Sequence, residues 1–391
     1  MKIALLSPLP PEQSGIADYA QALMSHLLAS GVTVETPLKA VAQDELQSVM
    51  EKTDWSRYDV VHAELGGGRL QEFAALQWLM RNRPTLVLTA TVHDPERLVW
   101  RPLHFPVGLE KLAKSWPLAD KLLTVLLDPW TLKAERALAG HLRRVVTLTH
   151  TGGQVLRARM RIGESVNVVI PHGVMPVESR PPAPVDTLRL LYFGFIYRGK
   201  GIEDVLQALA RLLEQRPELR GQLRLTLAGG AEPSMAFRSG GAYIDELVDT
   251  IGQLGLESNI DWQLNVPEQQ IAELIQNHHL MVLPYRESRK LALLGQIRGT
   301  SGALAWAMAC GRGVLASDTR AFAEELSYGN GQVFRQADAD ALALVLEQLL
   351  DAPSICLEWA AAAQLQGRKR AWPLVAEQFS GMFKEAACVS G

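Results

Sequence analysis

Two cations lie beside a glycine turn in the stretch FGFIYRGKGIEDV at residues 193–205. Arg198 and Lys200 follow a predicted strand that ends at Gly194, and a helix is predicted to begin near Ile202. An arginine can bind phosphate oxygens through two parallel hydrogen bonds and a lysine adds a point charge, so the pair could neutralise a diphosphate. The alternative is a solvated loop, in which both residue types are common.

Small or hydroxylated residues precede two predicted helices. Thr300, Ser301 and Gly302 start the helical stretch ALAWAMA. Gly15 lies between the first predicted strand and its helix. Backbone amides at a helix start bind anions, and glycine lets the backbone approach a ligand closely. Gly15 is equally consistent with an ordinary strand-to-helix turn.

Of two further polar motifs, we interpret one as part of a site and the other as the start of a helix. His93 and Asp94 end the predicted strand TLVLTATVH. A lone histidine is more often structural, but a strand end is where ligands of parallel sheets bind, so His93 is a candidate site residue. The sequence DAD at Asp338 to Asp340 is similar to a metal motif. It precedes a helical run, so we interpret it as a helix start and predict no metal site.

Strand-length apolar runs alternate with helical patterns in the first half of the chain. The helical patterns are IADYAQALMSHLLAS and LQEFAALQWLM. The predicted strands are KIALLSP, YDVVHAEL, TLVLTATVH, KLLTVLL, VVTLTH and VNVVI. Continuous β-branched runs separated by helices indicate parallel strands buried on both faces, so the fold class is α/β and doubly wound.

The pattern starts again after a proline-rich stretch from Pro171 to Thr187, which we predict to be a linker. We therefore predict an N-terminal domain at 1–172, a C-terminal domain at 173–370 and a last helix at 371–391 that packs back toward the first domain. Because ligands bind at the carboxyl ends of parallel strands, we expect the site in a cleft that the two sheets face.

The composition is ordinary for a globular protein, with 391 residues of which 48% are hydrophobic and 21% charged. A formal net charge of -3 gives no indication of nucleic-acid binding. The three cysteines are widely spaced and offer neither a disulfide framework nor metal spacing, which favours a reducing compartment.

The N-terminal stretch MKIALLSPLPPEQSG ends in prolines rather than in a small-residue cleavage site, so it predicts a first buried strand and no signal peptide. No apolar run approaches the roughly 18 residues that span a bilayer. We expect a cytoplasmic protein, with peripheral contact at the inner face of the membrane as a further expectation.

The ordered motifs resemble those of family 4 glycosyltransferases of group 1 type, over nearly the whole chain. The matching pieces are SGIADY, VHD, VVIPHGV, FGFIYRGKGIEDVLQALARL, LAGG, VLPY, GALAWAMACGRGVLASD and FAEEL. The resemblance implies the GT-B fold of two Rossmann-like domains that face each other across a cleft. It also implies transfer of a sugar from a nucleotide diphosphate sugar with retention, without a divalent metal or any other cofactor.

The resemblance also implies roles for individual residues. Arg198 and Lys200 would stabilise the leaving diphosphate, together with the amides of Ser301 and Gly302. Gly15 would lie against the donor near the acceptor side, with Gly194 at the donor as well. His93 would contact the hexose. Fixed donors aimed at a departing phosphate lower the barrier to transfer.

The sequence departs from the family at its usual acid pair. Two carboxylates eight positions apart are replaced by Arg298 and Trp306, although Gly299 is kept. The arginine that usually follows the equivalent of Gly194 is Phe195. We weigh three explanations. The favoured one is a branch of the family with a Ser-Gly turn and an aromatic residue in TSGALAW, so that Trp306 lines the donor site.

In the second explanation, Glu287 supplies a donor-site carboxylate and the residues after it, SRKLALLGQIR, form an inserted loop. In the third, the protein has lost activity. Retention in this family requires no protein nucleophile, so loss of the acids removes contacts that orient the donor rather than the reaction itself. We therefore predict an active enzyme with altered donor recognition.

The segment from Pro95 to Trp130 mixes aromatic and cationic residues, a composition that suits a membrane interface. Its members are Trp100, Phe105, Trp116 and Trp130 with Arg97, Arg101, Lys111, Lys114 and Lys121. The alternative, slightly favoured, is a flap over the first domain. If the interface forms, the acceptor would be linked to a lipid such as a polyprenyl carrier.

We predict a hexosyltransferase, with GDP-mannose as the suggested donor, that acts on a saccharide or lipid-linked acceptor in surface polysaccharide or lipopolysaccharide assembly. One alternative is a nucleotide-sugar epimerase of the same fold, which would need acid and base carboxylates around the sugar. Only Glu287 is a candidate for that role. The other alternative is a non-catalytic subunit that binds a sugar nucleotide.

Overall fold

The computed structural model describes residues 1–66, 68–100, 117–178, 180–184, 186–230, 240–287 and 294–388, without the side chains of 117–124 and 240–242. The chain divides into two compact units. Unit 1 consists of Met1–Gly173, Arg289–Thr300 and Trp372–Gly391, and unit 2 of Val174–Ser288 and Ser301–Ala371. The predicted division at residue 172 placed the stretch before Ser301 in the second domain, whereas it belongs to unit 1.

Unit 1 is built on a six-stranded parallel sheet with the order β2-β1-β3-β4-β5-β6. The strands are β1 (Lys2–Leu6), β2 (Thr33–Glu35), β3 (Val60–Leu65), β4 (Leu88–Val92), β5 (Arg144–Thr147) and β6 (Asn167–Val169). Every residue of β3 and β4 is buried, as expected for strands that helices cover on both faces.

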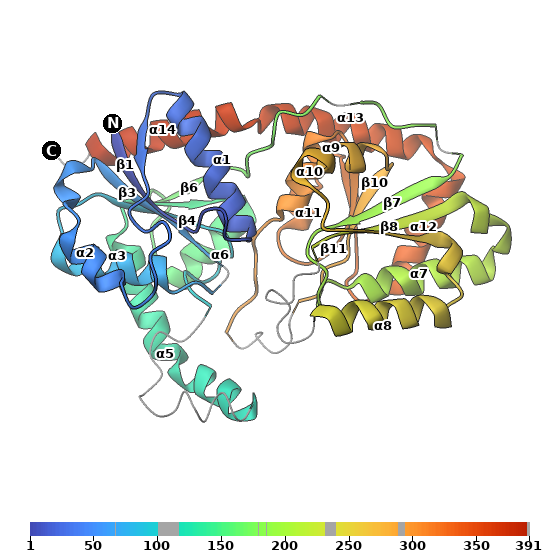
Figure 1. Ribbon diagram of the computed structural model, residues 1–391, viewed down its shortest axis with the longest axis horizontal. Coiled ribbons are helices and arrows are strands. Elements are labelled where there is room, and N and C mark those ends of the chain that lie inside the picture. Colours follow the sequence, from blue (N-terminus) through green and yellow to red (C-terminus); the bar gives the residue numbers. More distant parts are fainter. Residues whose placement is uncertain are drawn as a thin grey trace. The chain divides into compact units, whose positions relative to one another are not determined.

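Helices cover both faces of this sheet (Figure 1). They are α1 (Gly15–Ala29), α2 (Leu46–Lys52), α3 (Gln71–Asn82), α5 (Pro117–His141), α6 (His150–Met160) and α14 (Trp372–Cys388), with a short 3-10 helix at Trp55–Arg57. On one face, Val61, Ala63 and Leu65 pack with α2 and α3. On the other face, Val60 packs with the buried apolar residues of α1 and α14. The last helix of the chain therefore completes the core of unit 1.

One predicted strand is wrong, because KLLTVLL at 121–127 lies inside α5. A short apolar run fits a buried strand and a helix equally well, and its flanks decide between them. Here helix-forming residues continue on both sides as far as His141. Pro129 lies within this helix, which extends away from the sheet in Figure 1.

Unit 2 has a second six-stranded parallel sheet with the order β12-β11-β10-β7-β8-β9. Its strands are β7 (Leu188–Phe193), β8 (Leu223–Gly229), β9 (Ile260–Leu264), β10 (Leu280–Leu283), β11 (Gly313–Ser317) and β12 (Gly331–Phe334). The strand predicted to end at Gly194 is β7, whereas β12 was not predicted. Together the two sheets confirm the predicted doubly wound α/β class.

The helices of unit 2 also lie on both faces of its sheet (Figure 1). They are α7 (Ile202–Gln215), α8 (Gly240–Gln253), α9 (Glu268–Gln276), α10 (Gly302–Ala309), α11 (Phe322–Glu325), α12 (Ala339–Asp351) and α13 (Ser354–Lys369), with 3-10 turns at Pro217–Gln222 and Glu257–Asn259. Asp338 caps α12, since its Oδ1 accepts a hydrogen bond from the Ala341 amide at 2.9 Å. The interpretation of DAD as a helix start is confirmed.

The predicted linker is fastened to unit 2 through a buried arginine. Arg312 is 1% exposed, and its guanidinium has no carboxylate within ion-pair distance among the described residues. It donates instead to the carbonyl oxygens of Arg180, Gln276, His278, Cys310 and Gly311. Burial lowers the pKa of Arg312 to about 10. Its hydrogen bonds join the linker at Arg180 to the ends of α9 and α10.

We predict that Arg312→Lys lowers the free energy of unfolding by about 2–4 kcal/mol, because an ammonium has fewer donors and cannot reach these carbonyl oxygens together. Urea unfolding followed by circular dichroism measures the change. Arg220→Lys is the matched control, since Arg220 makes one surface hydrogen bond to the Gly255 carbonyl and should change stability by less than about 0.5 kcal/mol. Equal losses in both variants would contradict the prediction.

Candidate functional site

The turn between β7 and α7 lies against the carboxyl end of β10. Gly194 follows β7 with a φ of +140°, and Gly201 precedes α7 with a φ of +69°. A Cβ placed on Gly201 would lie 1.8 Å from the carbonyl oxygen of Pro284. Glycine at 201 therefore allows this close approach of the two segments.

Lys200 projects from this turn over the ring of Tyr285. Its Nζ atom lies 3.7 Å from the centroid of the Tyr285 ring and 5.1 Å from that of Tyr197. The Arg320 guanidinium lies 5.3 Å from the Tyr285 ring as well. In the described parts of the chain, Lys200 has no carboxylate within ion-pair distance. An ammonium held by aromatic rings keeps its charge available to an anion.

Tyr285 connects Lys200 to the start of α10. Its Oη atom lies 3.1 Å from Ser301 Oγ, in a hydrogen bond for which either hydroxyl could be the donor. Burial by itself would raise the pKa of Tyr285. The charge of Lys200 and the hydrogen bond with Ser301 outweigh burial, so the pKa lies below its ordinary value. In the sequence, Tyr285 stood out only as part of the VLPY motif, and it was not predicted as a site residue.

Ser301 occupies the N-cap position of α10 in an extended conformation. Its side chain makes no capping hydrogen bond to the helix amides, because its hydroxyl pairs with Tyr285. The amides of the first turn of α10, beginning at Gly302, could thus bind an anion, which stays a prediction. Trp306 is half-buried on this helix and packs against the core of unit 2. Its role in donor recognition stays a prediction.

Arg198 takes a different direction from Lys200. It forms an ion pair with Glu246 of α8, and its guanidinium lies 5.5 Å from the Tyr243 ring. The side chains of Arg198 and Glu246 are 56% and 46% exposed, so water screens their attraction. The structure therefore places both cations in one turn, but of the two it is Lys200 that lies over Tyr285, the hydrogen-bond partner of Ser301.

An ion pair between the exposed Arg286 and the buried Asp204 fixes the end of β10 to α7. Arg286 Nε donates to Asp204 Oδ2 at 2.7 Å, and a second guanidinium nitrogen donates to the other carboxylate oxygen. The Arg286 amide also donates to the Gly199 carbonyl at 3.0 Å. Neither member of the pair was predicted, although an acid in the first turn of a helix was a possible signal. The next residue, Glu287, donates its amide to Gln336 Oε1 at 3.0 Å.

Unit 1 has its own polar cluster where β3 and β4 end. His93 Nε2 lies 2.7 Å from Glu64 Oε2, and His62 Nε2 lies 3.3 Å from Glu64 Oε1. His62 and Glu64 are fully buried on the face that α1 and α14 cover, and His93 is 11% exposed. The ring of Tyr19 on α1 meets the His93 ring edge-on at 4.7 Å. Glu64 was not predicted, although it ends a predicted strand.

Glu64 is a carboxylate held ionised inside the protein. Burial alone would raise its pKa, but hydrogen bonds and charge from His62 and His93 lower the pKa of Glu64 to about 2. The carboxylate in turn fixes the orientation of the His93 ring. This arrangement would let His93 present its other nitrogen to a ligand.

The predicted donor residue Gly15 and Arg298, which replaces the first family acid, also lie in unit 1. Gly15 begins α1, where Ser14 Oγ accepts a hydrogen bond from the Ala17 amide at 3.1 Å. A Cβ on Gly15 would meet no atom within 4 Å, so the described contacts do not require glycine there. The Arg298 amide donates to the Pro95 carbonyl at 3.1 Å. Positions 298 and 306, where the family keeps its acids, thus fall in different units.

The predicted membrane segment is only partly described. Arg101, Phe105, Lys111, Lys114 and Trp116 lie outside the described residues, and so does the side chain of Lys121. Arg97 was predicted as an interface cation, but it is 3% exposed and paired with Asp128 and Glu135. That assignment is wrong, because the buried Glu135 and the partly buried Asp128 hold the guanidinium inside.

Neither a metal cluster nor a membrane-crossing helix is found in the described ranges. No three His, Cys, Asp or Glu side chains there come together as metal ligands would. Within the same ranges, no helix combines the length and the apolar character needed to cross a bilayer.

Residues 178–366 match the family model described as glycosyl transferases group 1. The chain is 24% identical over 334 residues to a D-inositol 3-phosphate glycosyltransferase of Thermobispora bispora, covering 84% of this chain and 71% of that protein. A protein with the same name from Streptomyces avermitilis is 26% identical over 246 residues, which cover 62% of this chain and 47% of the relative. The match thus spans about half the length of this second relative.

The whole fold is similar to that of HepE from Anabaena, solved in complex with UDP, with a TM-score of 0.67 at 17% identity over 98% of this chain and 100% of that one. This likeness confirms the predicted GT-B fold with its two Rossmann-like sheets. The family match and the curated relatives indicate a transferase, which confirms the prediction of an enzyme.

We predict that Gly201→Ala destabilises unit 2 and lowers ligand binding at Lys200, because the new Cβ would displace the Pro284 carbonyl. Gly199→Ala is the control, since Gly199 also has a positive φ, of +95°, but open space around its Cβ. The control should lose about 1–3 kcal/mol for backbone strain alone. Urea unfolding of both variants should show a clearly larger loss for Gly201→Ala, and equal losses would refute the steric argument.

We predict that Glu64→Gln removes stability that depends on pH. The folded-state pKa of Glu64, about 2, lies below the ordinary 4.5, so its stabilisation is complete above pH 4.5 and is lost as pH falls toward 2. The variant should be less stable by about 3 kcal/mol at pH 6, and this difference should shrink toward pH 3. Urea unfolding at both pH values measures it, with surface Glu257→Gln as control. A difference that does not vary with pH would contradict the assignment.

Proposed function

We propose that this protein is a retaining glycosyltransferase of family 4 that moves a hexose from a nucleotide diphosphate sugar to a saccharide or lipid-linked acceptor. The observation that carries the proposal is the Lys200 ammonium, which lies over Tyr285 without a carboxylate partner among the described residues, beside the start of α10. A fixed cation and the amides at a helix start together suit a diphosphate.

In the proposed reaction, the bond between the anomeric carbon and the diphosphate oxygen breaks and the acceptor oxygen bonds to the same face of that carbon. The acceptor proton passes to the departing phosphate oxygen. Negative charge grows on the diphosphate as the bond breaks, so Lys200 and the α10 amides stabilise the transition state more than the ground state. No carboxylate nucleophile takes part, which fits the replacement of the family acids by Arg298 and Trp306.

Arg198 would bind the diphosphate after its ion pair with Glu246 is broken. An exposed ion pair contributes only about 0–1 kcal/mol, so exchanging Glu246 for a doubly charged phosphate group costs little. His93 would contact the hexose while Glu64 holds its ring in place.

GDP-mannose and surface polysaccharide assembly are the finer part of the proposal and come from the family resemblance. The exposed apolar residues Leu126 and Trp130 on α5, which are 60% and 69% exposed, support a peripheral contact with a lipid-linked acceptor.

A thermal-shift panel of GDP, UDP, ADP and dTDP, with CMP as control, tests the donor site first. Stabilisation by one diphosphate follows from binding to the folded state and identifies the base. Turnover is then measured with sugars on that base, using D-inositol 3-phosphate among the acceptors because the curated relatives are named for it. Stabilisation without turnover would favour the non-catalytic subunit, and no stabilisation would refute the donor site.

We predict that Lys200→Ala lowers kcat by about 10²–10³-fold, as loss of one fixed donor to a developing charge does. The melting temperature should stay within about 2 °C, because the side chain lies at a turn and makes no ion pair with the described residues. Lys369→Ala, at the exposed end of α13, is the control and should behave like the wild type. Unchanged turnover in a folded Lys200→Ala variant would remove Lys200 from the reaction.

A further inference from the structure

Residues 294–300, which we call the strap, lie between β10 and α10 in the sequence but belong to unit 1. The chain enters unit 2 again at Ser301, the N-cap of α10. A segment inserted between two elements of one unit is therefore folded onto the other unit.

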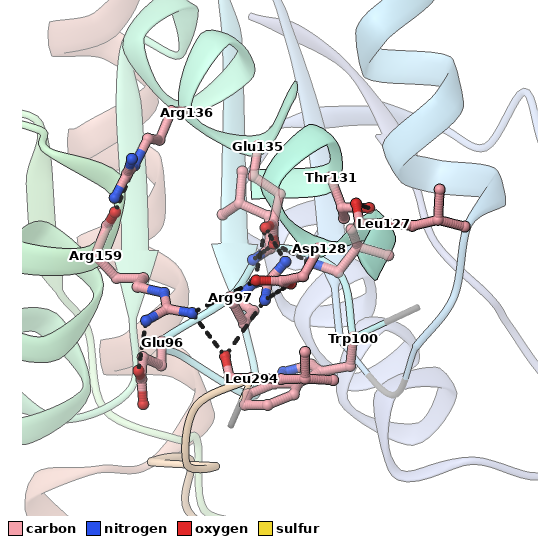
Figure 2. Close-up of polar contacts among 12 residues, drawn as sticks. Glu96, Arg97, Trp100, Leu127, Asp128, Thr131, Glu135, Arg136, Arg159 and Leu294 are labelled. Carbon is pink, nitrogen blue, oxygen red and sulfur yellow. Dashed lines mark hydrogen bonds and ion pairs between the residues drawn. The ribbon is translucent and has the colours of Figure 1, made fainter. Parts of the chain in front are cut away.

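Two arginines hold the first residue of the strap. The Leu294 carbonyl accepts hydrogen bonds from Arg159 Nη2 at 2.9 Å and from Arg97 Nη1 at 3.3 Å (Figure 2). Hydrogen bonds from charged donors are stronger than those between neutral groups, and one carbonyl with two such donors is a specific anchor.

Backbone hydrogen bonds hold the following residues. The Gln296 amide donates to Glu96 Oε2 at 2.7 Å, and the Arg298 amide donates to the Pro95 carbonyl at 3.1 Å. A Cβ on Gly295 would lie 2.9 Å from the Glu96 carboxylate, and its φ of +135° also favours glycine. The strap thus has a fixed register on the turn after β4.

Arg97 is itself fixed by the buried carboxylate of Glu135 and by the partly buried Asp128 (Figure 2). Arg97 Nε donates to Glu135 Oε2 at 2.7 Å, and Arg97 also pairs with Asp128. The other oxygen of Glu135 accepts the amides of Leu98 and Val99 at 2.7 and 2.9 Å. With these partners in place, Arg97 has little freedom to turn away from Leu294.

The strap joins two groups of the proposed reaction through the chain. A Cβ on Gly299 would lie 2.2 Å from the His93 carbonyl, so the backbone there lies directly against the proposed sugar-binding residue. Two residues later, Ser301 begins the proposed diphosphate site. We propose that Arg97 and Arg159 are positioning residues, which hold the strap and so limit the freedom of the chain where it enters α10 at Ser301. The catalytic part of this proposal rests on the proposed function.

Arg159→Gln tests the anchor, because Arg159 is partly exposed and its loss leaves the buried Arg97 pairs intact. Arg136→Gln is the matched control. Arg136 belongs to the same network through its bond to the Arg159 carbonyl at 3.0 Å, but it makes no bond to the strap. Both variants should fold, and circular dichroism checks this.

Hydrogen exchange followed by mass spectrometry measures the anchoring without any substrate. Peptides that cover 294–300 should exchange about tenfold faster in Arg159→Gln than in the wild type, since a charged hydrogen bond to the strap is lost. Arg136→Gln should exchange like the wild type. Unchanged exchange in Arg159→Gln would overturn the anchor.

Kinetics with the diphosphate and donor identified by the thermal-shift panel measure the positioning. Arg159→Gln should lower kcat about tenfold, while the Kd of the free diphosphate, which unit 2 binds, stays within about twofold. A parallel loss of diphosphate affinity, or an unchanged kcat with a released strap, would overturn the positioning role. Absence of turnover in the wild type would overturn the proposed function and the positioning role together, while the exchange result decides the anchor by itself.

Discussion

The edge formed by the carboxyl ends of parallel strands is the constraint on which both units depend. Strands buried on both faces accommodate few polar side chains, so polar groups collect where the strands end. In unit 2, β7 and β10 are neighbours in the sheet, which brings Lys200 to Tyr285. In unit 1, β3 and β4 are neighbours, which brings Glu64 to His93. Strand order, more than distance in the sequence, decides which residues meet.

Most of the fold could be predicted because continuous apolar runs between helical patterns have few other solutions. The exceptions have physical reasons. KLLTVLL carries no periodicity that separates a strand from a helix, and it became part of α5. The edge strands β2 and β12 have the sequences TVE and GQVF, in which polar residues interrupt the apolar run that marked the other strands.

From the sequence, site residues could be predicted only where they lie in a single turn or at the start of a helix. Lys200 and Ser301 were found because each lies at the end of a predicted element. Arg97 was misassigned, because its partners Asp128 and Glu135 follow 31 and 38 residues later and no local pattern connects them. The strap was assigned to the second domain, together with its neighbours in the sequence, for the same reason. The unit to which a segment belongs depends on tertiary hydrogen bonds, which no local pattern shows.

The position of α14 has a consequence for the order in which the chain can fold during synthesis. Its apolar residues cover one face of the unit 1 sheet, together with α1. The first strands therefore leave the ribosome long before Trp372–Cys388 is available to cover them, whereas the segments of unit 2 are already complete at Ala371. Unit 2 can become native first, whereas unit 1 lacks the cover of one sheet face until α14 has been synthesised.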